Sequence, residues 1–259
     1  MNGPLAGQVV VVTRPARQAA RFLRLLEERG ARTVAFPTIA VEAVPLAPDA
    51  LRAFETESFD WIVFTSANAV EHAPAPIRPA TKIAAIGGAT ARAIENLGRR
   101  VDARPAAGAD TEGLLALPAF ADVAGRRVLI VKGVGGRDAL RAGLSERGAH
   151  VVIAEVYRRV PVAPLAGAVE AVSRACDTGH AVVAVTSVEV LESLLALAPA
   201  SRVAGLLDAQ LLVPGERVAA AARARGWRGE IVVARSAEDD AMIAALEGGA
   251  PEERDPETA

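Results

Sequence analysis

The chain has 259 residues, of which 51% are hydrophobic, enough for one large domain or two small ones. Its formal net charge is −2 and only 3% of its residues are aromatic, which argues against a nucleic-acid-binding protein. The single cysteine, Cys176, excludes an internal disulfide and favours a cytoplasmic location. We expect no signal peptide and no membrane segment, because no apolar run reaches the roughly 18 residues that a membrane helix needs.

Short apolar runs alternate along the chain with segments in which apolar residues recur every third or fourth position. The runs predict buried parallel strands and the periodic segments predict helices. In chain order we predict a strand at 8–12, a helix at 16–29, a strand at 33–36, a helix at 48–57, a strand at 61–64, a helix at 67–72, a strand at 82–86, a helix at 89–97, a short strand at 101–103, a helix at 111–117, a strand at 125–131, a helix at 138–147, an extended segment at 151–160, a helix at 166–176, a strand from 181, a helix at 188–197, a strand at 210–213, a helix at 217–225, a strand at 231–234 and a helix at 238–246.

Two of these strands end in the same dipeptide. Thr65-Ser66 follows the run that begins at Trp61, and Thr186-Ser187 follows the run that begins at Ala181. In a parallel α/β sheet, ligands bind at the carboxyl ends of the strands. The hydroxyls either cap the next helix or contact a ligand together with the free N–H groups of that helix. The residues leave both interpretations open, and the duplication favours the ligand.

Two blocks of sequence each occur twice, in the order A, B, A, B. Block A covers 9–34 and 128–152, and block B covers 62–98 and 183–226. One block alone cannot cover both faces of a parallel sheet, so two blocks must share a sheet. Either consecutive blocks pair, or the outer blocks pair and the inner blocks pair. The long extended segments favour the second arrangement, because side by side they would form a two-stranded ladder.

We therefore predict an α/β fold with two similar, flavodoxin-like parallel-sheet domains joined by a two-stranded β linker. Domain 1 is discontinuous and comprises 1–38 plus 162–248, whereas domain 2 comprises 41–157. The linker strands are 37–44 and 155–161. The tail at 249–259 is rich in Gly, Pro and acidic residues, which predicts disorder. We expect a monomer, because no exposed apolar stripe stands out.

Several short motifs occur in a fixed order. They are Val12-Thr-Arg-Pro15, Phe64-Thr-Ser-Ala-Asn-Ala-Val70, Ile86-Gly-Gly-Ala-Thr-Ala-Arg92 with Gly98, Gly133-Val-Gly-Gly-Arg137 followed by Leu140, Gly148, and Val156-Tyr-Arg-Arg159. This combination resembles the uroporphyrinogen-III synthase family from about Val9 to Leu246. Lys132, where Arg is expected, and Val218, where Thr is frequent, depart from the pattern. The resemblance implies two α/β domains, a substrate cleft between them and no cofactor.

The family's substrate is hydroxymethylbilane, a linear tetrapyrrole that carries many carboxylates. The resemblance implies a lyase that removes water from this substrate and closes it to uroporphyrinogen III with ring D inverted. Unassisted, the substrate closes to the uninverted isomer. The protein must therefore hold one shape of the chain more than it must supply acid–base chemistry, and orientation alone can contribute several kcal/mol.

Carboxylates need donors, which strand ends, glycine-rich turns and arginines supply. We predict substrate contacts at Thr13, Arg14, Thr65, Ser66, Asn68, Gly87, Thr90, Lys132, Arg137, Arg158, Thr186 and Ser187. For any single arginine in so Arg-rich a chain, plain surface solvation is the better interpretation. Lys132 stands out because the chain has only two lysines, although it could equally be a solvated loop residue. Thr90 could donate to substrate or simply occupy the first turn of a helix.

Tyr157, the only tyrosine, is the catalytic candidate. The resemblance places it beside the cleft, where a phenol could donate its proton to the departing hydroxyl. The alternative is an aromatic ring packed between the domains, with its hydroxyl bonded to backbone.

Two other function classes stay open: a two-domain hinge protein that captures a small anion without chemistry, and a nucleotide-dependent α/β enzyme. Gly133 and Gly135 begin a dinucleotide-binding pattern, but Asp138 stands where its third glycine belongs. The three histidines are scattered, so we expect no metal site.

Overall fold

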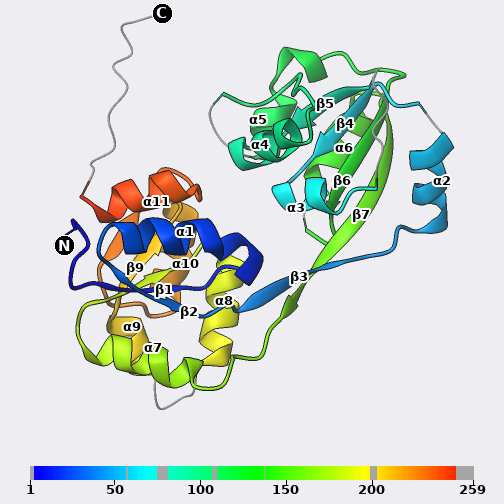
Figure 1. The fold of residues 1–259 in the computed structure, drawn as a ribbon. Helices are drawn as coiled ribbons and strands as arrows, with labels where there is room; N and C mark the ends of the chain where they lie inside the picture. Colours follow the sequence, from blue (N-terminus) through cyan, green and yellow to red (C-terminus); the bar gives the residue numbers. More distant parts are fainter. Residues whose placement is uncertain are drawn as a thin grey trace, which may run out of the picture. The chain divides into compact units, whose positions relative to one another are not determined.

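The computed structural model describes residues 3–56, 58–74, 81–106, 110–136, 138–198 and 203–248. Within these residues the protein has an α/β fold with two separate sheets whose strands are predominantly parallel (Figure 1). By its internal contacts the chain divides into unit 1, residues 1–40 with 160–259, and unit 2, residues 41–159.

The sheet of unit 1 has the strand order β10-β9-β8-β1-β2, and all neighbouring strands are parallel. This is the order of a doubly wound sheet, in which the winding direction reverses between β1 and β8. The strands are β1 (Val9–Val12), β2 (Arg32–Ala35), β8 (Ala181–Ala184), β9 (Gln210–Val213) and β10 (Ile231–Val233).

Helices cover both faces of this sheet, which explains why β1 consists of four consecutive valines. Val10 and Val12 pack with two helices on one face, and Val9 and Val11 pack with four helices on the other. The first face carries α1 (Ala16–Glu28) and α11 (Asp239–Leu246), and the second carries α7 (Ala168–Asp177), α8 (Val188–Leu197), α9 (Val203–Asp208) and α10 (Glu216–Ala224).

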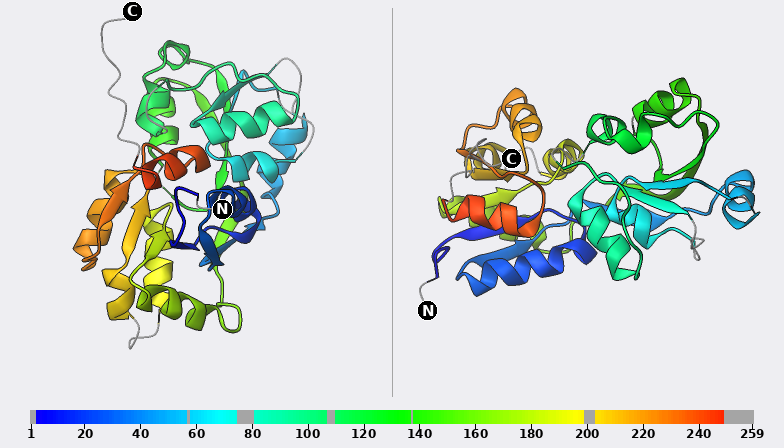
Figure 2. Two further views of the ribbon diagram at one scale, coloured as in Figure 1. Left: turned by 60° about the vertical axis from the view of Figure 1, so that its left-hand side comes forward. Right: turned by 90° about the horizontal axis from the view of Figure 1, so that it is seen from above.

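The first and last helices of the chain lie side by side, as Figure 2 shows for α1 and α11. Ion pairs link them: Arg21 contacts Asp240 at 2.9 Å, and Arg29, just after α1, contacts Glu247 at 2.7 Å. Unit 1 is therefore assembled from both ends of the chain.

The sheet of unit 2 has the order β3-β7-β6-β4-β5. The pairs from β7 to β5 are parallel, and the winding direction reverses between β4 and β6. The Val44 N–H donates to the Val156 carbonyl at 3.0 Å, and the Val162 N–H donates to the Thr38 carbonyl at 3.1 Å, so β3 and β7 run antiparallel. The strands are β3 (Ile39–Ala43), β4 (Trp61–Phe64), β5 (Lys82–Ala85), β6 (Arg127–Gly133) and β7 (His150–Pro161).

The faces of this second sheet are also covered. Ile62 and Phe64 of β4 pack toward one set of helices, and Trp61 and Val63 pack toward the other. The first set is α3 (Ala67–Glu71) and α4 (Gly88–Asn96), with Phe54 of α2 (Pro48–Thr56) at its margin; the second is α5 (Thr111–Leu115), the 3₁₀ turn η1 (Pro118–Phe120) and α6 (Ala139–Glu146).

The sheets confirm how the repeated blocks pair. The first block A and the last block B share one sheet, and the two inner blocks share the other. The predicted strand at 101–103 is wrong: only Ala103 forms an isolated bridge, to Ala84. Before it, the Ile83 N–H donates to the Asp102 carboxylate at 2.9 Å instead of to backbone, and after it Pro105 lacks the N–H that would continue the ladder. Helix α9 and η1 were not predicted. The predicted tail at 249–259 lies outside the described residues.

Candidate functional site

The carboxyl end of β4 lies beside the point where the winding of the unit 2 sheet reverses. The N–H and the hydroxyl of Thr65 both donate to the Val131 carbonyl, at 3.1 and 3.3 Å, and so tie β4 to β6. Ser66 follows in extended backbone, and its Oγ accepts the Ala69 N–H at 3.1 Å. Ser66 is therefore the N-cap of α3. That helix has only five residues, too few for an appreciable helix dipole.

Tyr157 on β7 meets this serine. Its hydroxyl lies 3.0 Å from Ser66 Oγ, and only 3% of the residue is exposed. The register between β6 and β7 shifts after Lys132, which places Gly133 opposite Tyr157. A Cβ at position 133 would lie 2.6 Å from the phenol Cζ, so the ring occupies space that only a glycine leaves open.

Arg159 joins this cluster from the same strand. Its Nη2 donates to the phenol oxygen at 3.3 Å, and its guanidinium carbon lies 5.6 Å from the ring centroid. The sequence prediction missed Arg159 and chose Arg158, whose exposed side chain instead pairs with Glu42 at 3.0 Å. Strand alternation was the available signal, because residues two apart share a face. We call Ser66, Gly133, Tyr157 and Arg159 the phenol cluster.

In unit 1 the corresponding strand ends carry Thr13, Thr186 and Ser187. Ser187 has nearly the same backbone angles as Ser66 and caps α8 by accepting the Val190 N–H at 3.2 Å. The fully buried Thr13 donates to the Ala184 carbonyl at 2.7 Å. Thr13, just after β1 and beside β8, therefore plays the part that Thr65 plays in unit 2.

Arg14 lies next to Thr13 and is bound within unit 1. Its guanidinium pairs with Asp239, donates to the Ala237 carbonyl at 3.0 Å, and lies 4.4 Å from the ring centroid of Phe22. Burial lowers the pKa of Arg14, and the Asp239 carboxylate acts in the opposite direction. These contacts tie the end of β1 to the start of α11.

The remaining predicted residues of unit 2 flank the same sheet edge. Gly87 is the N-cap of α4, and Thr90 is buried in the first turn of that helix. Asn68 is buried in α3, and the half-buried Lys132 stands opposite Glu155 in the strand register. Arg137 lies outside the described residues.

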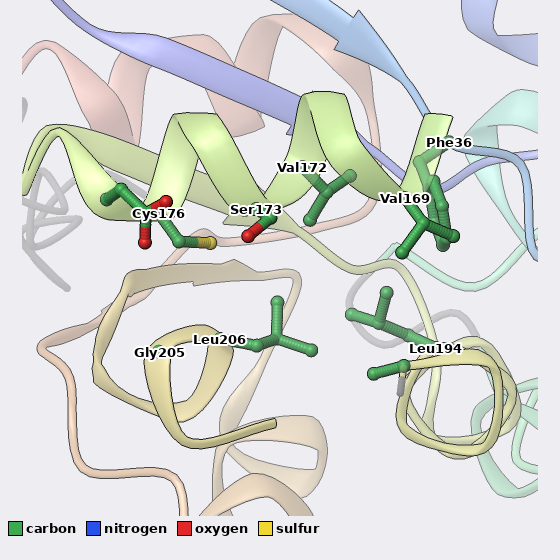
Figure 3. Close-up of a pocket in the computed structure, with 10 residues that line it drawn as sticks. Phe36, Val169, Val172, Ser173, Cys176, Leu194, Gly205 and Leu206 are labelled. Carbon is green, nitrogen blue, oxygen red and sulfur yellow. The ribbon is translucent and has the colours of Figure 1, made fainter. Parts of the chain in front are cut away.

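A cavity of about 100 Å³ lies in unit 1 between α7, α8 and α9 (Figure 3). Its walls include Phe36, Val172, Leu194 and Leu206, with Cys176 at one side. Burial raises the pKa of the Cys176 thiol, which disfavours the reactive thiolate. Apolar walls do not suit the carboxylate-rich substrate that the sequence resemblance implies, so this cavity is not the candidate site.

Two further features bear on function: metal-binding groups of side chains and membrane-spanning helices. Among the described residues, no group of three or more His, Cys, Asp and Glu side chains could hold a metal ion. Over the same part of the chain, no helix is both long and apolar enough to span a membrane.

Comparison with known proteins supplies the family. A family model described as uroporphyrinogen-III synthase HemD matches residues 20–244. The chain belongs to the uroporphyrinogen-III synthase family. The uroporphyrinogen-III synthases of Salmonella typhimurium and Escherichia coli K12 are 34% and 33% identical to it over 249 residues, which cover 92% of this chain and 99% of each relative. The resemblance drawn from the ordered motifs is thereby confirmed.

Solved structures support the fold. A crystal structure of a mutant uroporphyrinogen III synthase from Thermus thermophilus matches with a TM-score of 0.59 at 20% identity, covering 94% of this chain and 98% of that one. The enzyme from Helicobacter pylori 26695 matches with a TM-score of 0.59 at 16% identity, covering 91% and 96%. At such low identity these matches establish the α/β fold alone. The family assignment does not favour the anion-binding or nucleotide-dependent alternatives.

Proposed function

We propose that the chain is a cofactor-independent lyase that cyclises hydroxymethylbilane to uroporphyrinogen III, with loss of water and inversion of ring D. The observation that carries this proposal is the buried phenol of Tyr157 beside Ser66 at the strand-end edge of unit 2, in a chain of this family. An ordinary phenol keeps its proton at neutral pH and can pass it to a leaving group.

The proposed sequence of steps balances without an added reagent. The O–H of Tyr157 protonates the hydroxyl of the substrate, which leaves as water, so that the pyrrole that carried it becomes an azafulvenium cation and Tyr157 becomes a phenolate. Ring D attacks through its substituted carbon to give a spiro intermediate, which then reopens and closes with ring D inverted. The proton that the new ring junction releases restores the phenol. The protein contributes chiefly by holding the chain in the shape for this attack.

We propose that strand ends in both units bind the substrate carboxylates. Thr13, Arg14 and Thr90 are buried, and the first two are already bonded within their own unit, so direct contact there would require rearrangement, as it would for the equally buried Tyr157 hydroxyl. The half-buried Ser66 and Lys132 of unit 2, and Thr186 and Ser187 of unit 1, are therefore the stronger candidates. Substrate contact stays a prediction at Thr65, Asn68, Gly87, Arg137 and Arg158.

We propose further that the predicted domains, 1–38 plus 162–248 and 41–157, are joined by β3 and β7 as a two-stranded linker. Two observations support this: the boundaries between the units fall inside both strands, and the two strands are hydrogen-bonded at Thr38–Val162 and Val44–Val156. The substrate cleft between the domains, the monomeric state and the cytoplasmic location stay predictions.

The proposal is tested by incubating the protein with hydroxymethylbilane, oxidising the products and separating the porphyrin isomers. We expect isomer III to form in excess of the isomer I that arises without enzyme. Isomer I alone, at the uncatalysed rate, would contradict the proposal. Binding of hydroxymethylbilane without product would support the anion-binding alternative, and protection from unfolding by NAD or ATP would support the nucleotide-dependent one.

Tyr157→Phe removes the proton donor and keeps the ring. We expect turnover to slow several-fold without being abolished, because orientation of the substrate survives. Steady-state kinetics measures the effect, and thermal unfolding checks that the fold is retained. A wild-type rate in this variant would remove Tyr157 from the mechanism.

A further inference from the structure

The neighbours of the Tyr157 hydroxyl restrict where its proton can point. Arg159 Nη2 lies 3.3 Å from the phenol oxygen. A guanidinium can only donate, so the phenol oxygen is the acceptor in this contact. The Ser66 hydroxyl lies 3.0 Å from the same oxygen, and either of the two atoms could donate.

One lone pair of Ser66 Oγ is already in use, because this oxygen accepts the Ala69 N–H at 3.1 Å. If Ser66 donates to Tyr157, both lone pairs of the phenol oxygen are occupied and the phenol proton must point to a third group. If Tyr157 donates to Ser66, the serine proton is the one that points outward. In either arrangement, the Tyr157–Ser66 pair has one proton left for a ligand, and the Arg159 contact occupies a lone pair of the phenol oxygen that a ligand donor could otherwise use.

We propose that Arg159 is a positioning residue for Tyr157: it donates to the phenol oxygen and holds it in place, so that the remaining proton of the tyrosine–serine pair faces the departing hydroxyl of the substrate. This role rests on the proposed function. It also agrees with the packing, because Tyr157 is only 3% exposed and Gly133 leaves room for its ring in one place. The ring is thus fixed by Gly133 and its oxygen by Ser66 and Arg159.

Direct binding of a substrate carboxylate by Arg159 is the competing role, and kinetics separates the two. A residue that acts through Tyr157 affects kcat, whereas a residue that binds a distant carboxylate equally in substrate and transition state affects KM. The positioning role also limits how far Arg159→Met can lower kcat. Arg159→Met cannot cost more than Tyr157→Phe, and it should cost nothing further once the phenol oxygen is gone.

The test is a double-mutant cycle with Arg159→Met, Tyr157→Phe and the pair combined. We expect Arg159→Met to lower kcat about threefold, as for loss of one modest hydrogen bond, with KM unchanged. Arg159→Lys, which keeps a donor, should recover part of the loss. The combined variant should match Tyr157→Phe. Multiplied losses, or a raised KM at unchanged kcat, would overturn the proposal.

The matched control is Arg126→Met, the same substitution at the amino-terminal end of the strands of the same sheet. Arg126 precedes β6, is exposed, and contacts Asp60 at 3.0 Å. It should leave turnover unchanged. If it lowers kcat as much as Arg159→Met, loss of a positive charge explains both effects and the specific role of Arg159 is wrong.

A second readout does not depend on turnover. Because the chain contains one tyrosine, labelling tyrosine with ¹³C at Cζ gives a single resonance, from Tyr157. We expect Arg159→Met to shift this resonance and Arg126→Met to leave it in place; an unshifted resonance in Arg159→Met would overturn the contact. A wild-type protein without turnover would instead overturn the proposed function, and with it the role of Arg159 in this reaction.

Discussion

Gly133 shows how one missing side chain shapes the candidate site. An added Cβ would lie 2.6 Å from Tyr157 Cζ and 3.0 Å from its hydroxyl oxygen. We expect Gly133→Ala to push the ring off Ser66, to lower turnover at least as much as Tyr157→Phe, and to cost about 1–3 kcal/mol of unfolding free energy through overpacking. Enzyme kinetics and urea unfolding measure the two effects.

Gly205→Ala is the control for this substitution. In α9, a Cβ at position 205 would meet no atom within 4 Å, so the added methyl should stabilise by up to about 1 kcal/mol through helix propensity. If both variants behave alike, the close fit of Tyr157 against Gly133 is not what makes position 133 sensitive.

Sequence reasoning found residues of the site more reliably than their partners. It singled out Tyr157 and Ser66 separately, and their contact at 3.0 Å depends on a register shift in β6–β7 that no local pattern records. It named Arg158 for its place on the predicted linker and missed Arg159, which shares a strand face with Tyr157. It could not foresee that Arg14 is paired with Asp239, since that partner lies 225 residues away along the chain.

Among the elements, the junction between the end of β1 and the start of α11 depends on a buried ion pair. The Arg14 and Asp239 side chains are 8% and 13% exposed. We expect Asp239→Asn to cost about 3 kcal/mol of unfolding free energy, because it leaves the buried Arg14 charge without its partner. Urea unfolding measures this loss.

Asp240→Asn, one residue on, is the matched control. Asp240 is 74% exposed and pairs with the same Arg21 that contacts Asp239. Its loss should cost less than about 1 kcal/mol, as for other exposed ion pairs. Equal costs for the two variants would show that the Arg14–Asp239 pair does not hold the end of β1 to α11.

Elements with strong periodicity were predictable, and weak ones were not. Helix α8 and strand β9 begin and end at the predicted residues, since apolar residues and a Ser187 cap mark them locally. Helix α9 has six residues and contains Gly205, so neither its length nor its composition indicates a helix. Near residue 101, β propensity was outweighed by Pro105.

At the scale of the whole molecule, the repeat was the most informative signal. It predicted that the chain builds two sheets, one of them from both ends of the sequence, and the strand orders agree. The reason is physical: one block cannot cover both faces of a parallel sheet, and the extended strands favour pairing of the two inner blocks.

The central claim is that the protein determines the product by shaping its substrate, with Tyr157 assisting the loss of water. The most direct measurement is the isomer ratio formed by Tyr157→Phe, with enzyme in excess over hydroxymethylbilane. We predict that isomer III still dominates while the rate falls several-fold, because the fold that orients the chain is intact. Isomer I as the main product, under conditions in which the wild-type protein yields isomer III, would contradict this account.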